Sequence, residues 1–196
     1  AVVNEAKERL ENLRFYSDEA VEQADFYKAC IIGFPAMIRL SNRYADLAEE
    51  MAAKEADEKR KAELLQIAET CRQVPARPAR TFREAIQAFY FYWILIGSGT
   101  TPGGRFDQYM YPYYEADRKA GKITREFAQE LMDCIWVKLN DLNKARDAAS
   151  AEGFAGYSLF QNLIAGGQHA DGTDATNELS YMCIEATRHV MLPQPS

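Results

Sequence analysis

The residues best suited to chemistry in this chain lie between Ser98 and Tyr114. A turn rich in glycine, threonine and proline (97–104) leads into a segment that mixes Arg105, Asp107 and Gln108 with five aromatic side chains. Glycine lets a backbone approach a ligand closely, and small-molecule sites are mostly apolar and aromatic with a few placed polar groups. The stretch therefore predicts either one wall of a small-molecule site or a buried turn whose polar groups satisfy one another.

A second candidate lies further along the chain, where apolar, branched and aromatic residues predict a short buried strand over 158–165. Side chains alternate along a strand, so Tyr157, Leu159 and Gln161 share one face. A tyrosine and a glutamine on an otherwise apolar face need partners if they are buried, and that partner is either a ligand or another loop. The strongest binding candidates from the residues alone are Ser98, Thr100, Thr101, Tyr157, Phe160 and Gln161.

The histidine, the carboxylates and the cysteines considered next are interpreted as structural rather than catalytic residues. No G-x-S-x-G, Walker A or dinucleotide-binding glycine motif is present. His169 and Asp171 have H-x-D spacing but no third ligand nearby, so we expect a surface turn with Gly172 at its tight position and no metal site. The neighbouring carboxylates are interpreted as caps and solvated groups. The four cysteines are far apart, which predicts buried thiols in a reducing cytoplasm.

Composition excludes several classes of protein. Of the 196 residues 47% are hydrophobic and 12% aromatic, enough to build a core. A net charge of −6 argues against nucleic acid as the main partner, because phosphate binding needs a basic patch. The first residues do not resemble a signal peptide, and the longest nearly uncharged run, 85–104, is interrupted by glycine and proline. We therefore expect a cytoplasmic location and no membrane span.

The chain that positions these residues is predicted to be mainly helical. Apolar periodicity and capping residues predict helices at 2–14, 17–54, 58–71, 81–96, 125–143 and 174–190. Ser17 and Thr124 are expected N-caps, and Thr81 with Glu84 forms an expected capping box. Pro35 should kink the second helix. The first residue is not methionine and prolines flank the end, which indicates a piece of a longer polypeptide.

Several sequence blocks, taken in order, resemble those of the glycyl radical enzymes, the pyruvate formate-lyase-like superfamily. The resemblance covers nearly the whole chain, and its most specific part is G-R-F-D-Q-Y-x-Y-P followed by Q-N-L-I-x-G-G. The blocks are Arg43-Tyr-Ala-Asp-Leu-Ala, Cys71-Arg-Gln-Val-Pro, Thr81-Phe-Arg-Glu-Ala-Ile-Gln, Gly104-Arg-Phe-Asp-Gln-Tyr-Met-Tyr-Pro-Tyr-Tyr, Phe160-Gln-Asn-Leu-Ile-Ala-Gly-Gly-Gln and Asp174-Ala-Thr-Asn-Glu-Leu-Ser-Tyr.

This resemblance implies a fold and a set of site residues. The family fold is a ten-stranded α/β barrel, of which residues 1–196 would be part of the N-terminal half: outer helices plus the strand around 158–165. The turn around Thr100 and the strand around Gln161 would face the barrel centre. Matched residue by residue, the substrate-binding positions are Ser98, Thr100 and Tyr157, with Phe160 and Gln161 as weaker choices.

The resemblance also implies a chemistry. The parent would be an anaerobic, cytoplasmic lyase that breaks a C–C or C–heteroatom bond of a small polar substrate by thiyl-initiated radical chemistry. Its glycyl radical would be installed by an iron–sulfur activating enzyme that uses S-adenosylmethionine, and relatives are often homodimers. The radical glycine loop and the thiyl cysteine loop are not recognisable among these residues, so the segment would carry no catalytic residue and bind no cofactor directly.

One departure bears on the reaction subclass. Relatives that dehydrate diols often carry E-x-N-G-H-S before the G-R-F-D-Q block, whereas this chain has Ile96-Gly-Ser-Gly-Thr-Thr-Pro-Gly. The missing acid and histidine argue against glycerol or propanediol dehydration and leave an arylacetate decarboxylase-like reaction as one option. The alternatives to a lyase are a non-catalytic helical binding or scaffold module derived from the family, and a small-ligand-binding domain that uses the same turn.

Overall fold

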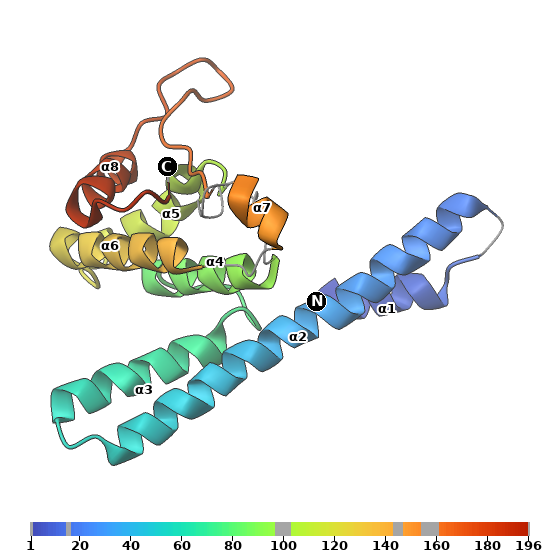
Figure 1. The fold of residues 1–196 in the computed structure, drawn as a ribbon, viewed down its shortest axis with the longest axis horizontal. Helices are drawn as coiled ribbons and strands as arrows, with labels where there is room; N and C mark the ends of the chain where they lie inside the picture. The colour runs from blue at the N-terminus through green and yellow to red at the C-terminus, as the bar shows by residue number, and fades with distance from the viewer. Residues whose placement is uncertain (1, 15–16, 97–102, 143–146, 154–160, 196) are drawn as a thin grey trace. The chain divides into compact units, whose positions relative to one another are not determined.

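The structure is a computed structural model that describes residues 2–14, 17–96, 103–142, 147–153 and 161–195 (Figure 1). Over these residues it contains eight helices and two isolated β-bridges, so the prediction of a mainly helical chain is confirmed. The chain divides into two compact units, Ala1–Pro78 and Ala79–Ser196. That residues 1–196 together form part of one barrel domain stays a prediction.

The first unit is a set of three helices, α1 (Val2–Glu11), α2 (Asp18–Lys54) and α3 (Glu58–Gln73). Pro35 lies inside α2 without ending it, and α2 continues as one ribbon of 37 residues (Figure 1). Helix α3 runs back along the second half of α2, and small buried residues on α2 permit this close packing. The buried alanines are Ala45, Ala48 and Ala52, and α3 contributes Leu64, Ala68 and Cys71.

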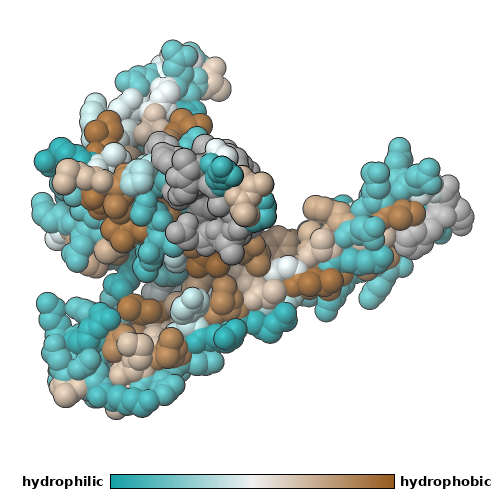
Figure 2. Space-filling view, viewed as in Figure 1, coloured by the Kyte–Doolittle hydropathy of each residue, from teal (hydrophilic) through white to brown (hydrophobic). Residues whose placement is uncertain are grey.

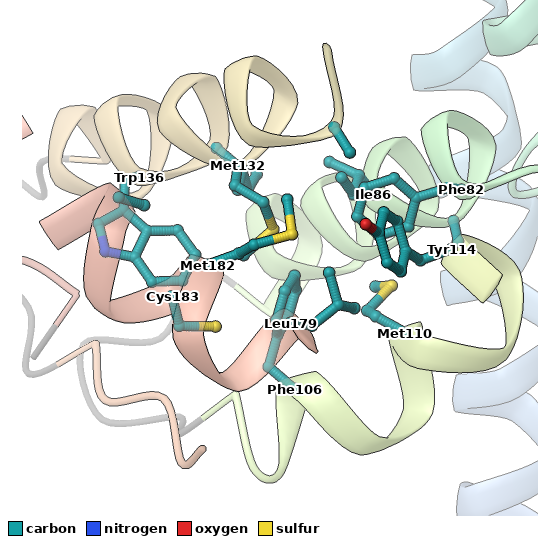
Figure 3. Packing of buried hydrophobic residues seen from close by; sticks show 14 of the residues in the cluster. Phe82, Ile86, Phe106, Met110, Tyr114, Met132, Trp136, Leu179, Met182 and Cys183 are labelled. Atoms are coloured by element: carbon teal, nitrogen blue, oxygen red, sulfur yellow. The ribbon is translucent and has the colours of Figure 1, made fainter. Parts of the chain in front are cut away.

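The second unit contains α4 (Phe82–Ile96), α5 (Phe106–Lys119), α6 (Arg125–Asp141), the short α7 (Ala148–Gly153) and α8 (Glu178–Val190). Four of them, α4, α5, α6 and α8, enclose an aromatic and methionine-rich core (Figure 3). Trp136 lies in this core and also donates a hydrogen bond from Nε1 to the Thr187 hydroxyl at 2.9 Å, which ties α6 to α8. No helix within the described ranges has both the length and the apolar character needed to cross a bilayer.

Local signals predicted most helix ends correctly. The hydroxyl of Thr124 accepts from the Phe127 N–H at 3.1 Å, and that of Thr81 accepts from the Glu84 N–H at 3.2 Å. The last helix begins at Glu178 rather than at Asp174, because Asn177 and Ser180 form a reciprocal capping box there. Asp174 instead accepts from the Thr176 N–H at 2.9 Å in the preceding loop.

Two expectations need correction. The aromatic segment after Arg105 is a helix, α5, whose buried side chains Phe106, Met110 and Tyr114 recur every four residues. The predicted strand over 158–165 is not formed in its described part, 161–165. That part makes a single parallel bridge between Ile164 and Arg105, and among the described residues its backbone bonds along this edge are those to Gly103 and Gly104.

The cysteines differ in exposure, contrary to the prediction that all four are buried. Cys71 and Cys183 are buried and Cys30 is half-buried, but Cys134 on α6 is exposed. Burial raises the pKa of Cys71 to about 11. Burial, with a contribution from Asp107, raises the pKa of Cys183 to about 12.

These pKa values predict an order of alkylation. The thiolate is the nucleophile, and at pH 8 a thiol of pKa about 12 is ionised to only about one part in ten thousand. Iodoacetamide at pH 8 should therefore modify the exposed Cys134 before the buried Cys183, and should reach Cys183 only after denaturant is added, as peptide mass spectrometry would show. Native-state labelling of Cys183 at the rate of Cys134 would contradict this.

The core of the second unit predicts a stability difference along α8. Leu179 is fully buried, so Leu179→Ala should lower the free energy of unfolding by about 2–5 kcal/mol. Tyr181, two residues further along the same helix, is 61% exposed, so Tyr181→Ala should change it by less than about 0.5 kcal/mol. Urea unfolding followed by circular dichroism measures both, and equal effects would contradict the packing described.

Candidate functional site

The two sequence blocks singled out above meet through backbone hydrogen bonds. The N–H of Gly103 donates to the carbonyl of Asn162 at 2.7 Å, and the N–H of Ile164 donates to the carbonyl of Gly104 at 2.8 Å. Within 161–164 the alternation of side chains is as predicted: Gln161 is buried and Leu163 packs against the core, while Asn162 and Ile164 are exposed. The glycine-containing turn and the extended segment are therefore neighbours in the described part of the site.

A side chain at position 103 would overlap its neighbours unless Leu163 moved. A Cβ built on Gly103 would lie 2.0 Å from Cδ2 of Leu163 and 3.2 Å from the ring of Trp93. Leu163 and Trp93 both belong to the core of the second unit. The close approach of the two segments thus depends on the absence of one methyl group.

Arg105 binds the carbonyl side of a double-glycine turn. Gly166 and Gly167 have φ values of +72° and +91°, which L side chains rarely adopt. The Arg105 guanidinium donates to the carbonyls of Gly166 at 2.8 Å and Gln168 at 3.0 Å. A cation with several donors in one plane is suited to holding two carbonyls of a tight turn.

Asp107 binds the N–H side of the same turn. Its side chain is fully buried, and Oδ2 accepts from the Gly166 N–H at 2.6 Å and from the Ser180 hydroxyl. Oδ1 is also buried and has no hydrogen-bond partner among the described residues. Phe106, between the two charged residues, packs edge-to-face on Phe89 and Trp136 at ring distances of 5.1 Å and 6.1 Å.

Further bonds bring the start of α8 to this turn. Gln108 donates from Nε2 to the carbonyl of Ala175 at 2.7 Å, and Asn177, the N-cap of α8, donates from Nδ2 to the carbonyl of Asp107 at 3.3 Å. Tyr109 donates its hydroxyl proton to the carbonyl of Gly103 at 2.7 Å. Burial, together with the nearby Cys183 and Asp107, raises the pKa of Tyr109, so this donor keeps its proton at neutral pH.

Gln161 is the one predicted binding residue that lies within the described residues. It is 1% exposed, and its N–H donates to Oε1 of Gln194, also 1% exposed, at 2.6 Å. Its own side-chain Oε1 has no partner in the described part of the chain. The other predicted positions lie outside the described residues: Ser98, Thr100, Thr101, Tyr157 and Phe160.

A small pocket of about 140 Å³ lies beside the extended segment in the second unit. Leu163 and Ala165 line it together with residues from α6, α8 and the C-terminal segment: Trp136, Cys183, Ile184, Thr187 and Pro195. A larger hollow of about 530 Å³ lies between α1 and α2 in the first unit, and none of the predicted binding residues lines it.

The loop that carries His169 is a hydrogen-bonded turn, as expected. Gly172 has a φ of +84°, and Asp171 accepts from the N–H and the hydroxyl of Thr173 at 3.0 Å and 2.7 Å. These bonds lower the pKa of Asp171. Over the ranges that the structure describes, no three His, Cys, Asp or Glu side chains are grouped in a way that could hold a metal ion.

Several residues that build the site have no role predicted from the sequence. Asp107 stands out only as a polar residue among aromatics, Asn177 and Ser180 occur only within the last family block, and Gln194 has no predicted role. The available signal was an acid at position 107 within an aromatic stretch, because an acid that is buried needs a partner. Its partner Gly166 follows far along the chain, and local patterns do not show such pairs.

Comparison with known proteins identifies the family. All of residues 1–196 match the family model described as pyruvate formate lyase-like. The chain belongs to this family of glycyl radical enzymes, which confirms the resemblance seen in the sequence blocks.

The family relatives are lyases and dehydratases. The chain is 39% identical to the isethionate sulfite-lyase of Desulfovibrio desulfuricans over 202 residues, and 38% identical to the trans-4-hydroxy-L-proline dehydratase of Clostridioides difficile over 196 residues. These alignments cover 100% and 96% of the chain but 24% and 25% of the relatives. The chain thus spans about a quarter of the curated relatives it matches.

Solved structures of the family match the described fold. A Roseburia inulinivorans protein from a structural study of 1,2-propanediol dehydration is 55% identical with a TM-score of 0.91. The glycerol-bound form of the B12-independent glycerol dehydratase from Clostridium butyricum is 47% identical with a TM-score of 0.87. In both cases the match covers 100% of this chain and 25% of the other.

The contact at Gly103 yields a prediction. Gly103→Ala should lower the free energy of unfolding by about 1–3 kcal/mol, because its methyl group would overlap Leu163. Leu163→Ala removes the overlapping atoms, so the double variant should lose less than the sum of the two single variants. Thermal unfolding of the four proteins measures this coupling, and strict additivity would show that the two residues do not touch.

Proposed function

We propose that the complete protein is a glycyl radical lyase that removes a polar group from a small polar substrate, most closely in the manner of the dehydratases. The observation that carries this is the overall likeness of the chain to that group. Two matching solved structures concern 1,2-propanediol dehydration and glycerol dehydratase, at 55% and 47% identity, whereas the indoleacetate decarboxylase of Tractidigestivibacter scatoligenes is 33% identical. The identities favour C–O cleavage over decarboxylation.

In this proposal residues 1–196 supply part of the wall of the substrate pocket, called the substrate wall below. Ser98 and Thr100 on the turn, with Tyr157, Phe160 and Gln161 on the extended segment, would contact the substrate. The pairing of Gly103 with Asn162 supports this, because it joins the polypeptide that follows the turn to the polypeptide that follows Tyr157. Gln161 is suited to such a role: its buried Oε1 is an acceptor that meets no donor among the described residues, and a substrate hydroxyl would supply one.

The reaction that this wall would serve is a radical elimination. A hydrogen atom would pass to the thiyl cysteine of the complete protein from the carbon that bears one hydroxyl. That hydroxyl would give up its proton, the neighbouring hydroxyl would leave with a proton as water, and the hydrogen atom would return to the carbon that lost its hydroxyl, so that a 1,2-diol becomes an aldehyde and water. The wall's own contribution is to hold the hydroxyl groups and to exclude solvent from the reactive carbon. The sequence at 96–103 lacks the acid and histidine of E-x-N-G-H-S, so we infer a substrate head group other than that of glycerol or propanediol.

The rest of the proposal concerns the complete protein. Its glycyl radical would be installed by an activating enzyme that uses S-adenosylmethionine and an iron–sulfur cluster, in an anaerobic cytoplasm, and the enzyme would form a homodimer. The ten-stranded barrel would be completed by further polypeptide. Exposed apolar side chains along α2 support this, because such surface is typical of a face that contacts other protein (Figure 2). They include Phe26, Ile32 and Leu47.

The test begins with the gene and continues with the activated enzyme. Sequence downstream of Ser196 should encode a thiyl cysteine loop and a radical glycine loop. The complete protein, incubated anaerobically with its activating enzyme, S-adenosylmethionine and a reductant, should show a glycyl radical signal by electron paramagnetic resonance. A panel of propane-1,2-diol, glycerol, trans-4-hydroxyproline, isethionate and indoleacetate then identifies the bond cleaved by product analysis, with the unactivated enzyme as control.

The outcomes separate the candidate functions. Turnover of a hydroxylated substrate with loss of water supports the proposal. Decarboxylation of indoleacetate alone would place the enzyme in the other subclass. A gene that lacks both loops, or a protein that gives no radical signal with an activating enzyme proven on a relative, would overturn the proposal and favour the non-catalytic module.

A further inference from the structure

The Gly166–Gly167 turn is held from both sides by one short stretch of chain. Arg105 donates to two carbonyls of the turn, and Asp107 accepts from its N–H at 2.6 Å. The two residues are separated only by Phe106, which is fully buried. The turn follows directly after the extended residues 161–165, so whatever fixes the turn also fixes the place of those residues.

Burying the Asp107 carboxylate costs more free energy than burying an uncharged side chain that makes the same hydrogen bonds. A carboxylate removed from water needs its lone pairs occupied, and the described residues occupy only those of Oδ2. Replacement of such a group by an apolar one is often neutral or favourable for stability. The acid is therefore better explained by the geometry that it imposes than by its contribution to the free energy of folding.

That geometry joins three elements at one oxygen atom. Oδ2 of Asp107, at the first turn of α5, accepts from the Gly166 turn and from Ser180 in the first turn of α8. Ser180 is part of the capping box of α8, so its hydroxyl is already held in place by the Asn177 N–H at 3.0 Å. A shift of any one element lengthens a bond to the same atom.

We propose that Asp107 is a positioning residue for the substrate wall: it holds the Gly166 turn so that the extended residues 161–165 keep their register against Gly103 and Gly104. This inference rests on the proposed function, which makes 161–165 part of that wall. Asp107 itself touches no substrate. Its effect on the reaction comes through Gln161 and its neighbours, whose position is set at one end by Asp107 and at the other by Gln194.

Replacing Asp107 by asparagine distinguishes the effect of its hydrogen-bond geometry from the effect of its charge. In Asp107→Asn the amide oxygen takes the place of Oδ2 and accepts from the Gly166 N–H and the Ser180 hydroxyl, while the amide NH₂ takes the place of the unpartnered Oδ1. The conservative variant therefore keeps the turn in place without the charge. Asp107→Ala removes both bonds, and Ser180→Ala removes one bond and leaves the acid.

The experiment uses the complete activated enzyme and its identified substrate. We expect Asp107→Ala to lower kcat/KM about a hundredfold, the size of effect that a displacement of about 1 Å produces, and Ser180→Ala to lower it about tenfold. The glycyl radical content per enzyme should stay at the wild-type level. Asp107→Asn should recover to within about threefold of wild type. Asp171→Ala, which removes a carboxylate that accepts an N–H in an exposed turn, is the matched control and should behave as wild type.

A second measurement does not depend on turnover. Hydrogen–deuterium exchange of peptides that span 161–168 should be faster in Asp107→Ala and Ser180→Ala than in wild type, and unchanged in Asp107→Asn and Asp171→Ala. If Asp107→Ala does not fold, Ser180→Ala still carries both readouts. The inference would be overturned if Ser180→Ala had both the kinetics and the exchange rates of wild type. It would also be overturned if Asp107→Asn were as impaired as Asp107→Ala. A wild-type enzyme without radical or turnover would instead overturn the proposed function, and exchange alone would then decide whether Asp107 fixes the segment.

Discussion

The hydrogen bond between the Asp107 carboxylate and the Gly166 N–H is the constraint through which the glycine turn, α5 and α8 meet. A buried carboxylate is stable only if donors surround it, and the donors here come from the glycine turn and from α8. That requirement brings the first turns of α5 and α8 to the same point. With α8 fixed there, Leu179 and Met182 reach the core that also contains Phe106 (Figure 3).

Helices whose signals are local were predicted from the sequence, and α5 was not. Thr124 and the regular apolar spacing of α6 lie within one stretch of chain, so the pattern was sufficient. In α5 the tyrosines at 109, 111 and 113 suggest alternation, and Pro112 lowers the helix propensity. The fully buried apolar side chains are Phe106, Met110 and Tyr114, and their spacing shows the helix only after these three less buried tyrosines are set aside.

The sequence predicts which segments form the candidate site but not the contacts between their residues. The alternation of 161–164 correctly placed Gln161 on the buried face. Its partner Gln194 and the pairing of Asp107 with Gly166 are contacts between residues distant in sequence, and no periodicity encodes them. The strand expected at 158–165 needed neighbours on its edges, and in the described chain one edge meets only Gly103 and Gly104.

The described contacts of the site form a frame that uses no side chain of residues 97–102. The side chains of Arg105 and Asp107 bond the backbone of the glycine turn, and Gly103 packs against Leu163. On the proposed function, substitutions at 97–102 would change the polar groups offered to a substrate and leave these contacts in place. This accounts for a chain that lacks E-x-N-G-H-S and is nevertheless 55% identical, with a TM-score of 0.91, to a protein studied for diol dehydration. On the proposed function, the substrate would be set by residues 97–102, whereas the overall likeness would reflect the frame.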